Sequence, residues 1–464
     1  MVDQQLRPGD AFEVTCTGLD ETGAGVAVTT SGAEQLRLHV PSVLAGERAR
    51  IRLDHLSAHG GGGAREAWAT LVAVLEPSPD RVTATCPAYG VCGGCTVMDL
   101  AYPAQLTWKT ERVRLQLAFH ATLATLTVEP CVPSPCVVGY RNQAKYVYGR
   151  ERDSGRAVLG AFAPRSHQIV DLAGCQVVEP VLDEARRILL EVLSENGVEP
   201  FDEILRTGVL RYAMLRATLS GQVMATLVTA RSDWASAEAV ATLLRQRCPA
   251  VISVILSVNP STGNALFGDQ ERVLVGQATI DDTIGDVRVR LSSRSFFQAN
   301  RQVASRIYRD IVAAAPDGIV RAVDAYAGAC GIALSLVARA NEVIAIEENG
   351  AATHAAADFL AELAKGGGDA DRVRVVTGDA ASCLADIGDA GFVVLNPPRK
   401  GCSAEVLAAI TRLCPKMVAY LSCDPRTLAR DLAILVSAGA HVAKVTPYDM
   451  MPHTPHVETL ALVV

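Results

Sequence analysis

A cysteine and an asparagine in the last third of the chain stand where a reaction site could form. Cys423 follows the strand-like run 417–422, and Asn396 follows the run 392–395. In an open α/β sheet, ligands bind outside the carboxyl ends of the strands, so both side chains are expected at one crevice. Two prolines after Asn396 fix the chain there. Although most cysteines are small core residues, this placement favours Cys423 as a nucleophile.

The thiol of Cys423 needs activation for that role. A cysteine with its ordinary pKa of about 8.5 is mostly neutral at neutral pH, and the thiolate is the reactive form. The pKa of Cys423 is therefore expected to be lowered. A helix that starts near Thr427 and a cationic cofactor are the candidates for this effect.

A glycine turn after the run 320–326 is the candidate for binding that cofactor. Gly328 lies in this turn, where the backbone can approach a ligand closely. The next strand-like run ends at Glu347, and an acid at that place can bind ribose hydroxyls. Asp379, after the third run, is a candidate partner for an adenine amino group. Because the full G-x-G-x-x-G is missing, the pattern favours a single adenosine, such as S-adenosylmethionine, over a dinucleotide.

The elements that must position these residues are those of an α/β sheet. Strand-like runs alternate with Ala/Leu-rich helical stretches from Arg294 onward, which is typical of a doubly wound sheet. The runs 440–447 and 457–464 follow each other without a helix, so they are expected to form an antiparallel edge. The five expected strands of the alternating part are 320–326, 343–347, 373–377, 392–395 and 417–422.

The earlier part of the chain reads as two further domains. Residues 1–78 contain about five short strands, the number expected of a small barrel. Residues 79–290 mix a cysteine-rich start, a helix at 100–122, strands and a helix at 182–196. The predicted domains are therefore 1–78, 79–290 and 291–464.

Composition limits the class of protein. The chain has 464 residues, of which 49% are hydrophobic and 20% charged, as in ordinary globular proteins. No apolar run reaches the ~20 residues of a membrane span, and the first residues do not resemble a signal peptide. We expect a cytoplasmic monomer. A net charge of −7 argues against a protein coated with nucleic acid, but it leaves room for a local basic groove.

Three of the thirteen cysteines fall close together. Cys86, Cys92 and Cys95 lie in one glycine-rich stretch, so their thiolates could converge on a metal with a fourth ligand from elsewhere. Zinc and a [4Fe–4S] cluster both accept four cysteines, and the spacing does not decide between them.

A basic stretch with interleaved aromatic residues lies between Arg141 and Asp171. Cations beside stacking rings are the usual means of binding single-stranded RNA. The alternative is a solvated strand face. Six arginines and lysines outnumber three acids in this stretch: Arg141, Lys145, Arg150, Arg152, Arg156 and Arg165.

Five motifs resemble those of the RNA 5-methyluridine (uracil-5-) methyltransferases, and they occur in the order of that family. They are Ser295-Phe-Phe-Gln298-Ala-Asn300, Asp324-x-Tyr326-x-Gly328, Asn396-Pro-Pro-Arg399-x-Gly401, Ser422-Cys423-Asp424-Pro425 and Pro452-His-Thr-x-His456-Val-Glu458. The resemblance implies an N-terminal OB-like barrel (a TRAM domain), a central α+β domain and a C-terminal Rossmann-like methyltransferase sheet. Within the family, the architecture is similar to the iron–sulfur enzymes of 23S rRNA.

The resemblance also implies roles for residues. Cys423 would add to carbon 6 of uracil, which makes carbon 5 nucleophilic enough to take a methyl group, and Glu458 would then remove the proton from carbon 5. Cofactor contacts are implied for Gln298, Tyr326, Glu347 and Asn396. Cys175 is implied as the fourth ligand of a [4Fe–4S] cluster with a structural function. The implied partner is RNA, with rRNA favoured and a tRNA T-loop uridine as the alternative.

One departure keeps two other functions open. The family usually has Asp at the position of Asn396. Asn-Pro-Pro is also similar to amino-group methyltransferases of RNA or DNA, which would not need Cys423, but here Arg399 replaces the aromatic residue expected after the prolines. A non-catalytic RNA-binding factor with the same fold is the second alternative.

Overall fold

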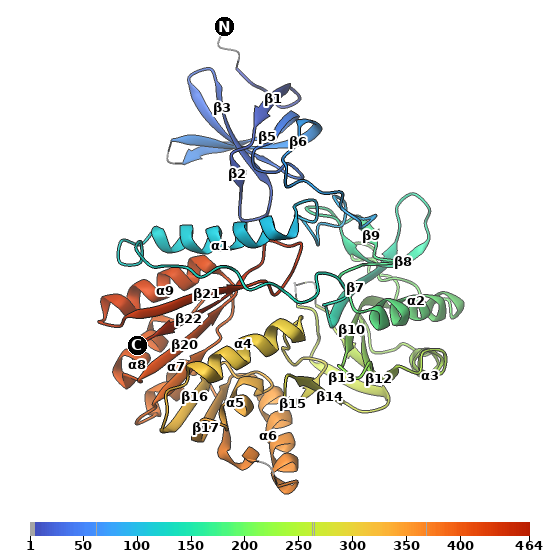
Figure 1. Cartoon of the computed structure of the whole chain (residues 1–464). Coiled ribbons are helices and arrows are strands. Elements are labelled where there is room, and N and C mark those ends of the chain that lie inside the picture. The colour runs from blue at the N-terminus through green and yellow to red at the C-terminus, as the bar shows by residue number, and fades with distance from the viewer. Residues whose placement is uncertain (1–4, 62, 262, 264, 368) are drawn as a thin grey trace. The chain divides into compact units, whose positions relative to one another are not determined.

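The computed structural model describes the whole chain apart from residues 1–4, 62, 262, 264 and 368. The chain forms two compact units, and each is considered by itself. The first comprises Met1–Arg112 with Met451–Pro455, and the second comprises Val113–Met450 with His456–Val464. The strands form several sheets, and helices lie between the strands along the chain, so the expected mixed α/β fold is confirmed (Figure 1).

The first unit contains a six-stranded sheet in the order β1-β5-β6-β4-β3-β2. Its inward side chains alternate with outward ones, as in β4, where Leu36, Leu38 and Val40 are buried. Sequence patterns missed the two-residue β2, and β5 and β6 are longer than expected. The strands are β1 (Ala11–Thr15), β2 (Gly18–Leu19), β3 (Gly25–Ser31), β4 (Glu34–Val40), β5 (Arg48–Gly61) and β6 (Ala64–Glu76). Helix α1 (Tyr102–Ala118) begins in this unit.

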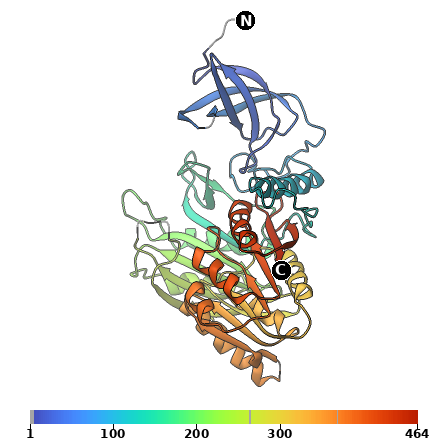
Figure 2. The ribbon, with the colours of Figure 1, turned by 90° about the vertical axis from the view of Figure 1, so that its left-hand side faces the viewer.

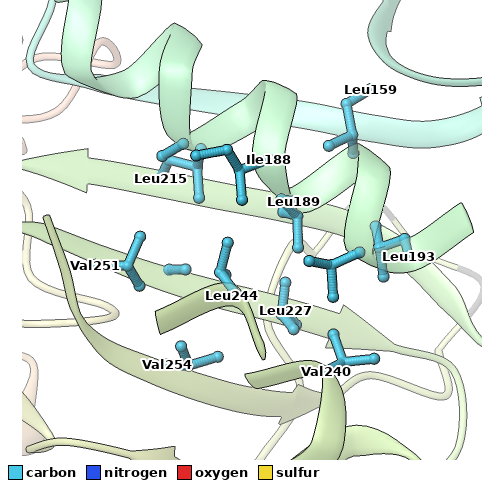
Figure 3. Packing of buried hydrophobic residues seen from close by; sticks show 14 of the residues in the cluster. Leu159, Ile188, Leu189, Leu193, Leu215, Leu227, Val240, Leu244, Val251 and Val254 are labelled. Carbon is cyan, nitrogen blue, oxygen red and sulfur yellow. The ribbon is translucent and has the colours of Figure 1, made fainter. Parts of the chain in front are cut away.

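The second unit starts with a seven-stranded sheet in the order β13-β12-β11-β10-β7-β8-β9, which we call the central sheet. Helices α2 (Pro180–Glu195) and α3 (Ala237–Arg247) pack on it through one apolar cluster, in which Leu189, Leu215 and Leu244 are buried (Figure 3). The strands are β7 (Gln143–Arg150), β8 (Ala157–Phe162), β9 (Ile169–Asp171), β10 (Leu210–Ala217), β11 (Val223–Thr229), β12 (Val251–Val258) and β13 (Gln270–Val275).

A two-stranded ribbon, β14 (Thr279–Ile284) and β15 (Val287–Ser292), leads from the central sheet to helix α4 (Arg301–Ala314). The side chain of Asn300 caps α4 by accepting a hydrogen bond from the amide of Val303. The segment 295–299 between the ribbon and the helix has neither strand nor helix structure.

The C-terminal sheet has the order β18-β17-β16-β19-β20-β22-β21 and lies beside the central sheet (Figure 2). Strands β16 to β20 pair with one another in parallel. Strand β22 runs antiparallel to both β20 and β21, so the expected antiparallel pairing of the last two strands is confirmed. The strands are β16 (Ile319–Ala325), β17 (Ala340–Glu347), β18 (Val373–Thr377), β19 (Phe392–Leu395), β20 (Met417–Ser422), β21 (Val442–Tyr448) and β22 (Glu458–Val463). The helical segments between them are α5 (Gly331–Leu336), α6 (Gly350–Lys365), η1 (Asp369–Arg372), α7 (Ala380–Asp386), α8 (Ala404–Leu413) and α9 (Pro425–Ser437).

In the part of the chain that the structure describes, no helix combines the length and the apolar character needed to cross a membrane.

Candidate functional site

A pocket of about 380 Å³ opens at the carboxyl ends of β16 and β19. Its wall contains four of the six residues predicted to bind the cofactor: Gln298, Tyr326, Gly328 and Asn396. The segment before α4, the turn after β16 and the end of β19 therefore meet at one place. This is the edge at which open α/β sheets bind ligands.

The turn after β16 has an unusual backbone. Tyr326 and Cys330 have φ angles of 70° and 61°, values that favour glycine, and Gly328 lies between them at 53°. Such conformations cost of order 1–3 kcal/mol each and occur often at ligand-binding sites. The carboxylate of Glu347 accepts a hydrogen bond from the amide of Gly328 at 2.9 Å. Glu347 thus supports the turn.

The two predicted adenosine-binding acids lie next to this wall. Besides Gly328, Glu347 accepts a hydrogen bond from the amide of Asn349 at 2.9 Å. Asp379 caps α7 by accepting from the amide of Ser382 at 3.0 Å. Neither acid is among the residues that line the pocket. Their contact with an adenosine stays a prediction.

Asp324, at the end of β16, carries a buried carboxyl group below the turn. One oxygen accepts a hydrogen bond from the amide of Ala333 at 2.9 Å, and the other has no hydrogen-bond partner among the described residues. Burial raises the pKa of Asp324 to about 7, the charge of Glu347 acts in the same direction, and the hydrogen bond from Ala333 opposes them. This carboxyl group is therefore largely neutral at slightly acidic pH.

Cys423 and Glu458 come together through the pairing of two antiparallel strands. Ser422 at the end of β20 pairs with Thr459 of β22, and one further step along the same register places Cys423 opposite Glu458. Glu458 also pairs with Tyr448 of β21. The predicted nucleophile and the predicted base thus lie at opposite positions where the end of β20 meets the start of β22.

The expected lowering of the cysteine pKa is wrong for this structure. Burial raises the pKa of Cys423 to about 11, and the negative charge of Glu458 adds to the effect. The positive charge of Arg399 and the amide of Cys423 act against it. Helix α9 does begin at Pro425, near the expected place, but its start does not offset the loss of hydration.

Burial also raises the pKa of Glu458, to about 7, and Arg399 again opposes the change. A carboxylate with this pKa is a stronger base than an exposed one, which suits proton removal at neutral pH. Arg399 is exposed and lies 3.4 Å from Nδ1 of His456, measured from its Nη2 atom. Sequence reasoning did not identify Arg399 as a functional residue, and its place directly after the two prolines was the available signal.

Phe296 is the other residue that sequence reasoning missed. Its side chain lines the pocket and is 66% exposed, although a large apolar ring is usually buried. An exposed aromatic ring is a surface on which a base can stack. The preceding Ser295 and the following Phe297 are both buried, so of these three residues only Phe296 exposes its side chain to solvent.

Among the described residues, no histidines, cysteines, aspartates or glutamates form a group that could hold a metal ion, so the four predicted metal ligands do not form one there. Cys86, Cys92 and Cys95 belong to the first unit and Cys175 belongs to the second. The side chain of Cys175 packs against the apolar cluster of the central sheet. The [4Fe–4S] cluster therefore stays a prediction from the resemblance.

The two histidines of the last motif make hydrogen bonds with neighbouring groups. His453 lies 3.2 Å from the amide nitrogen of Gln105, and its backbone amide donates to Oε1 of the same glutamine at 2.9 Å. His456 has the contact with Arg399 given above. This agrees with a structural role for both rings.

The basic stretch between Arg141 and Asp171 is partly neutralised. Arg150 forms an ion pair with Glu199 at 2.7 Å, and Arg156 forms one with Asp171 at 2.9 Å. Lys145 on β7 is exposed, and its ammonium group lies 4.3 Å from the centre of the Tyr212 ring.

Known proteins resemble this chain over part or nearly all of its length. Residues 385–464, which contain Asn396, Cys423 and Glu458, match the family model described as tRNA (uracil-5-)-methyltransferase. An uncharacterized RNA methyltransferase of Geobacter sulfurreducens is 36% identical over 98% of this chain and 90% of the relative. One of Halalkalibacterium halodurans is 33% identical over 98% of this chain and 97% of the relative.

A solved structure has the same fold. The tRNA (uracil-54, C5)-methyltransferase of Pyrococcus abyssi, in complex with S-adenosyl-L-homocysteine, superposes with a TM-score of 0.74 at 24% identity and covers 98% of this chain and 100% of its own. The curated relatives match over nearly their whole length as well. The chain belongs to the RNA (uracil-5-)-methyltransferase family and is an S-adenosylmethionine-dependent RNA methyltransferase.

Proposed function

We propose that this enzyme methylates carbon 5 of a uridine in RNA through a covalent adduct between Cys423 and carbon 6 of the base. The observation that carries the proposal is the register of β20 and β22, which sets Cys423 opposite Glu458. Asn396 directly follows the neighbouring strand β19 and lines the pocket, so the proposed site for a methyl donor lies next to this pair.

The two side chains divide the reaction between them. The thiolate of Cys423 adds to carbon 6, and the electron pair of the 5,6 double bond makes carbon 5 a nucleophile. Bound S-adenosylmethionine would supply the methyl group to carbon 5 and leave as S-adenosyl-L-homocysteine. Glu458 then removes the proton from carbon 5, the double bond re-forms, and the thiolate of Cys423 leaves carbon 6.

The pKa values indicate when the thiolate forms. The pKa of Cys423 is about 11, so forming the thiolate at neutral pH has a free-energy cost in the ligand-free protein. The proton of the thiol is proposed to leave to solvent, because Glu458 must stay ionised to take the proton of carbon 5 later. Arg399 lowers the cost of forming the thiolate, and a positive sulfonium nearby would lower it further. We therefore infer that Cys423 is protonated until both substrates are bound.

The pocket is proposed to hold the methyl donor. Gln298, Tyr326 and Asn396 offer polar groups to it, and Gly328 brings backbone close to the ligand. Glu347 and Asp379, beside the wall, are proposed to bind the ribose hydroxyls and the adenine amino group. Asn396 keeps the acceptor oxygen of the aspartate that the family usually has, without its charge.

Covalent trapping tests the proposed mechanism. RNA in which 5-fluorouridine replaces uridine should form a stable adduct with the protein and S-adenosylmethionine, because fluorine cannot be removed from carbon 5 as a proton is. Peptide mapping should place the adduct on Cys423. Methylation without an adduct would contradict the mechanism, and methyl groups on base amines would favour amino-group transfer instead. Failure to bind S-adenosylmethionine would favour a non-catalytic RNA-binding factor.

We propose ribosomal RNA as the substrate, on the resemblance of the architecture to the iron–sulfur enzymes of 23S rRNA. The alternative is a T-loop uridine of tRNA, since the Pyrococcus abyssi enzyme of the same fold acts on uracil 54 of tRNA. Nucleoside mass spectrometry of the two RNA pools, from cells with and without the gene, separates these substrates. If 5-methyluridine were lost from tRNA alone, the substrate would be tRNA and not ribosomal RNA.

The [4Fe–4S] cluster remains a proposal from the same resemblance. Its support is chemical: four cysteines are a suitable donor set, and three of them lie within ten residues, from Cys86 to Cys95. Methyl transfer needs no electrons, so the proposed role is structural. Its test is given in the Discussion.

A further inference from the structure

The segment 295–299 supplies Phe296, Phe297 and Gln298 to the pocket, yet it has no regular structure of its own. Buried backbone carbonyl groups outside helices and strands need partners from elsewhere. Here the partners come from the central sheet, and they serve successive residues of the segment.

The first contact is made by a buried arginine of β10. Nη2 of Arg216 donates to the carbonyl oxygen of Ser295 at 2.7 Å. The side chain of Arg216 is buried, and its Nη1 atom has no hydrogen-bond partner among the described residues. Burying a guanidinium group costs several kcal/mol unless its bonds compensate. The negative charge of Asp282 offsets part of this cost. A buried cation that donates to the carbonyl oxygen of Ser295 indicates that the position of Ser295 matters.

The second contact is made by Asn142, the residue before β7. Its side-chain amide donates to the carbonyl oxygen of Gln298 at 2.8 Å, and its backbone amide donates to that of Ala299 at 3.0 Å. Asn142 is fully buried. Its own carbonyl oxygen accepts from the amide of Ala217, directly after Arg216 on β10, at 2.8 Å. The two donors are thus joined to each other by the sheet.

A weaker contact completes the set. Nε2 of Gln143 lies 3.5 Å from the carbonyl oxygen of Phe297. The carbonyl groups of Ser295, Phe297, Gln298 and Ala299 therefore all face donors of β7 or β10. Local bonds fix the start of the segment as well, since the amide of Ser292 donates to the hydroxyl of Ser295 at 2.9 Å.

We infer that Arg216 and Asn142 are positioning residues for the cofactor pocket: they hold the backbone of 295–299 so that Gln298 and Phe296 present their side chains to the ligand. The inference rests on the proposed function for the identity of the ligand. It adds that the central sheet, and not only the C-terminal sheet, determines the affinity for the methyl donor.

Arg211 provides a matched control on the same strand. It is also buried, and it donates to the carbonyl oxygens of Asn259 and Ser261, both at 2.9 Å. Neither of these residues lines the pocket. Arg211 forms an ion pair with Glu203 at 2.7 Å as well, so its replacement is at least as costly to stability as that of Arg216. Replacing Arg211 or Arg216 by methionine removes a buried charge with its carbonyl bonds, so the two variants share the general cost to stability and differ in which segment is released.

Binding of S-adenosyl-L-homocysteine to the full-length protein, measured by calorimetry, tests the inference. Arg216→Met should raise the Kd about tenfold, the size expected for a hydrogen bond from a charged donor. Arg211→Met should leave the Kd unchanged, although both should lower the melting temperature. Arg216→Lys keeps a charged donor and should restore most of the affinity. Equal Kd values for Arg216→Met and the wild type, or an equal loss in Arg211→Met, would overturn the inference.

A double-mutant cycle gives a readout that a merely structural role would not move. If Arg216 acts through the segment that carries Gln298, the two substitutions should not be additive. The loss of binding free energy in the double variant Arg216→Met, Gln298→Ala should be smaller than the sum of the losses in the two single variants. Full additivity would contradict the coupling. If Arg216→Met does not fold, Asn142→Ala takes its place, because it keeps the backbone bond to Ala299 and removes only the donor to Gln298. A wild-type protein that does not bind S-adenosyl-L-homocysteine would refute the proposed function itself.

Discussion

Cys423 and Glu458 occupy the register step that follows the pair Ser422 and Thr459, so a thiol and a carboxyl group face each other where β20 and β22 meet. Burial raises the pKa of both groups, and the charge of Glu458 raises the pKa of Cys423 further. Their shared neighbour Arg399 is the cation that lowers both pKa values. Charge at this sheet edge is therefore controlled by three residues together.

The first prediction concerns the nucleophile. Cys423→Ala should abolish methylation of RNA, because no other group adds to carbon 6, and should leave binding of S-adenosyl-L-homocysteine nearly unchanged. Methyl transfer to RNA and calorimetric binding are the measurements. Cys414→Ala is the control, since Cys414 is exposed at the end of α8. Undiminished turnover by Cys423→Ala would rule out the covalent route.

The second prediction concerns the base. Glu458→Gln should still form the methylated adduct with RNA but resolve it slowly, because only removal of the proton from carbon 5 is impaired. Removing a general base typically costs ~10²–10⁴-fold in rate. Denaturing gels of the protein–RNA adduct with normal uridine should show its accumulation. Normal turnover would mean that another group, with Asp424 or a water molecule as the next candidates, takes the proton.

The strands around this pair could be predicted closely from the sequence. The expected runs 373–377, 392–395 and 417–422 have the same bounds as β18, β19 and β20. Strands β19 and β20 are almost entirely buried, and buried parallel strands read as short apolar runs between turn residues. In contrast, β5 and β6 are longer than the runs 49–53 and 67–75 that the sequence predicts for them, since their solvent-facing residues hide the pattern.

The pocket residues Gln298, Tyr326, Gly328 and Asn396 could be predicted because each lies in a motif next to a strand end or turn. The pKa values could not. The sequence offered a helix start and a cation as reasons for a lowered cysteine pKa, but loss of hydration outweighs them, and burial depends on tertiary packing. The hydrogen-bond donors Arg216 and Asn142 could not be predicted either, because they are far in sequence from the carbonyl groups to which they donate.

The third prediction uses the charge of Arg399. Glu458 must be ionised to act as a base, so resolution of the adduct should rise with pH around a midpoint near 7. Arg399→Gln removes a charge that lowers this pKa, and the midpoint should move to higher pH. Arg399→Lys keeps the charge and should move it less. The rate of adduct resolution against pH is the measurement, and an unshifted profile in Arg399→Gln would contradict the electrostatic role.

The fourth prediction concerns RNA binding by the central sheet. Lys145→Gln should weaken binding of RNA without affecting binding of S-adenosyl-L-homocysteine. The slope of log affinity against log salt concentration should become less steep by the amount that corresponds to about one phosphate contact. Arg150→Gln is the matched control from the same strand, because the cation of Arg150 is already paired with Glu199. Fluorescence anisotropy at several salt concentrations provides both quantities. Equal losses in the two variants would indicate a diffuse electrostatic effect.

The last prediction concerns the cysteines of the first unit. If the resemblance to the iron–sulfur enzymes holds, protein purified without oxygen should be brown and contain about four iron atoms per chain. Cys92→Ser should then lose the iron, whereas Cys414→Ser should retain it. Because a lost ligand releases a constraint on the stretch from Cys86 to Cys95, Cys92→Ser should also lower the melting temperature and the affinity for RNA. Its affinity for S-adenosyl-L-homocysteine should be preserved, since the pocket is built from residues of the second unit. Colourless protein with one zinc, or with no metal, would remove the iron–sulfur proposal and leave the methyltransferase assignment untouched, because the family membership rests on the whole chain.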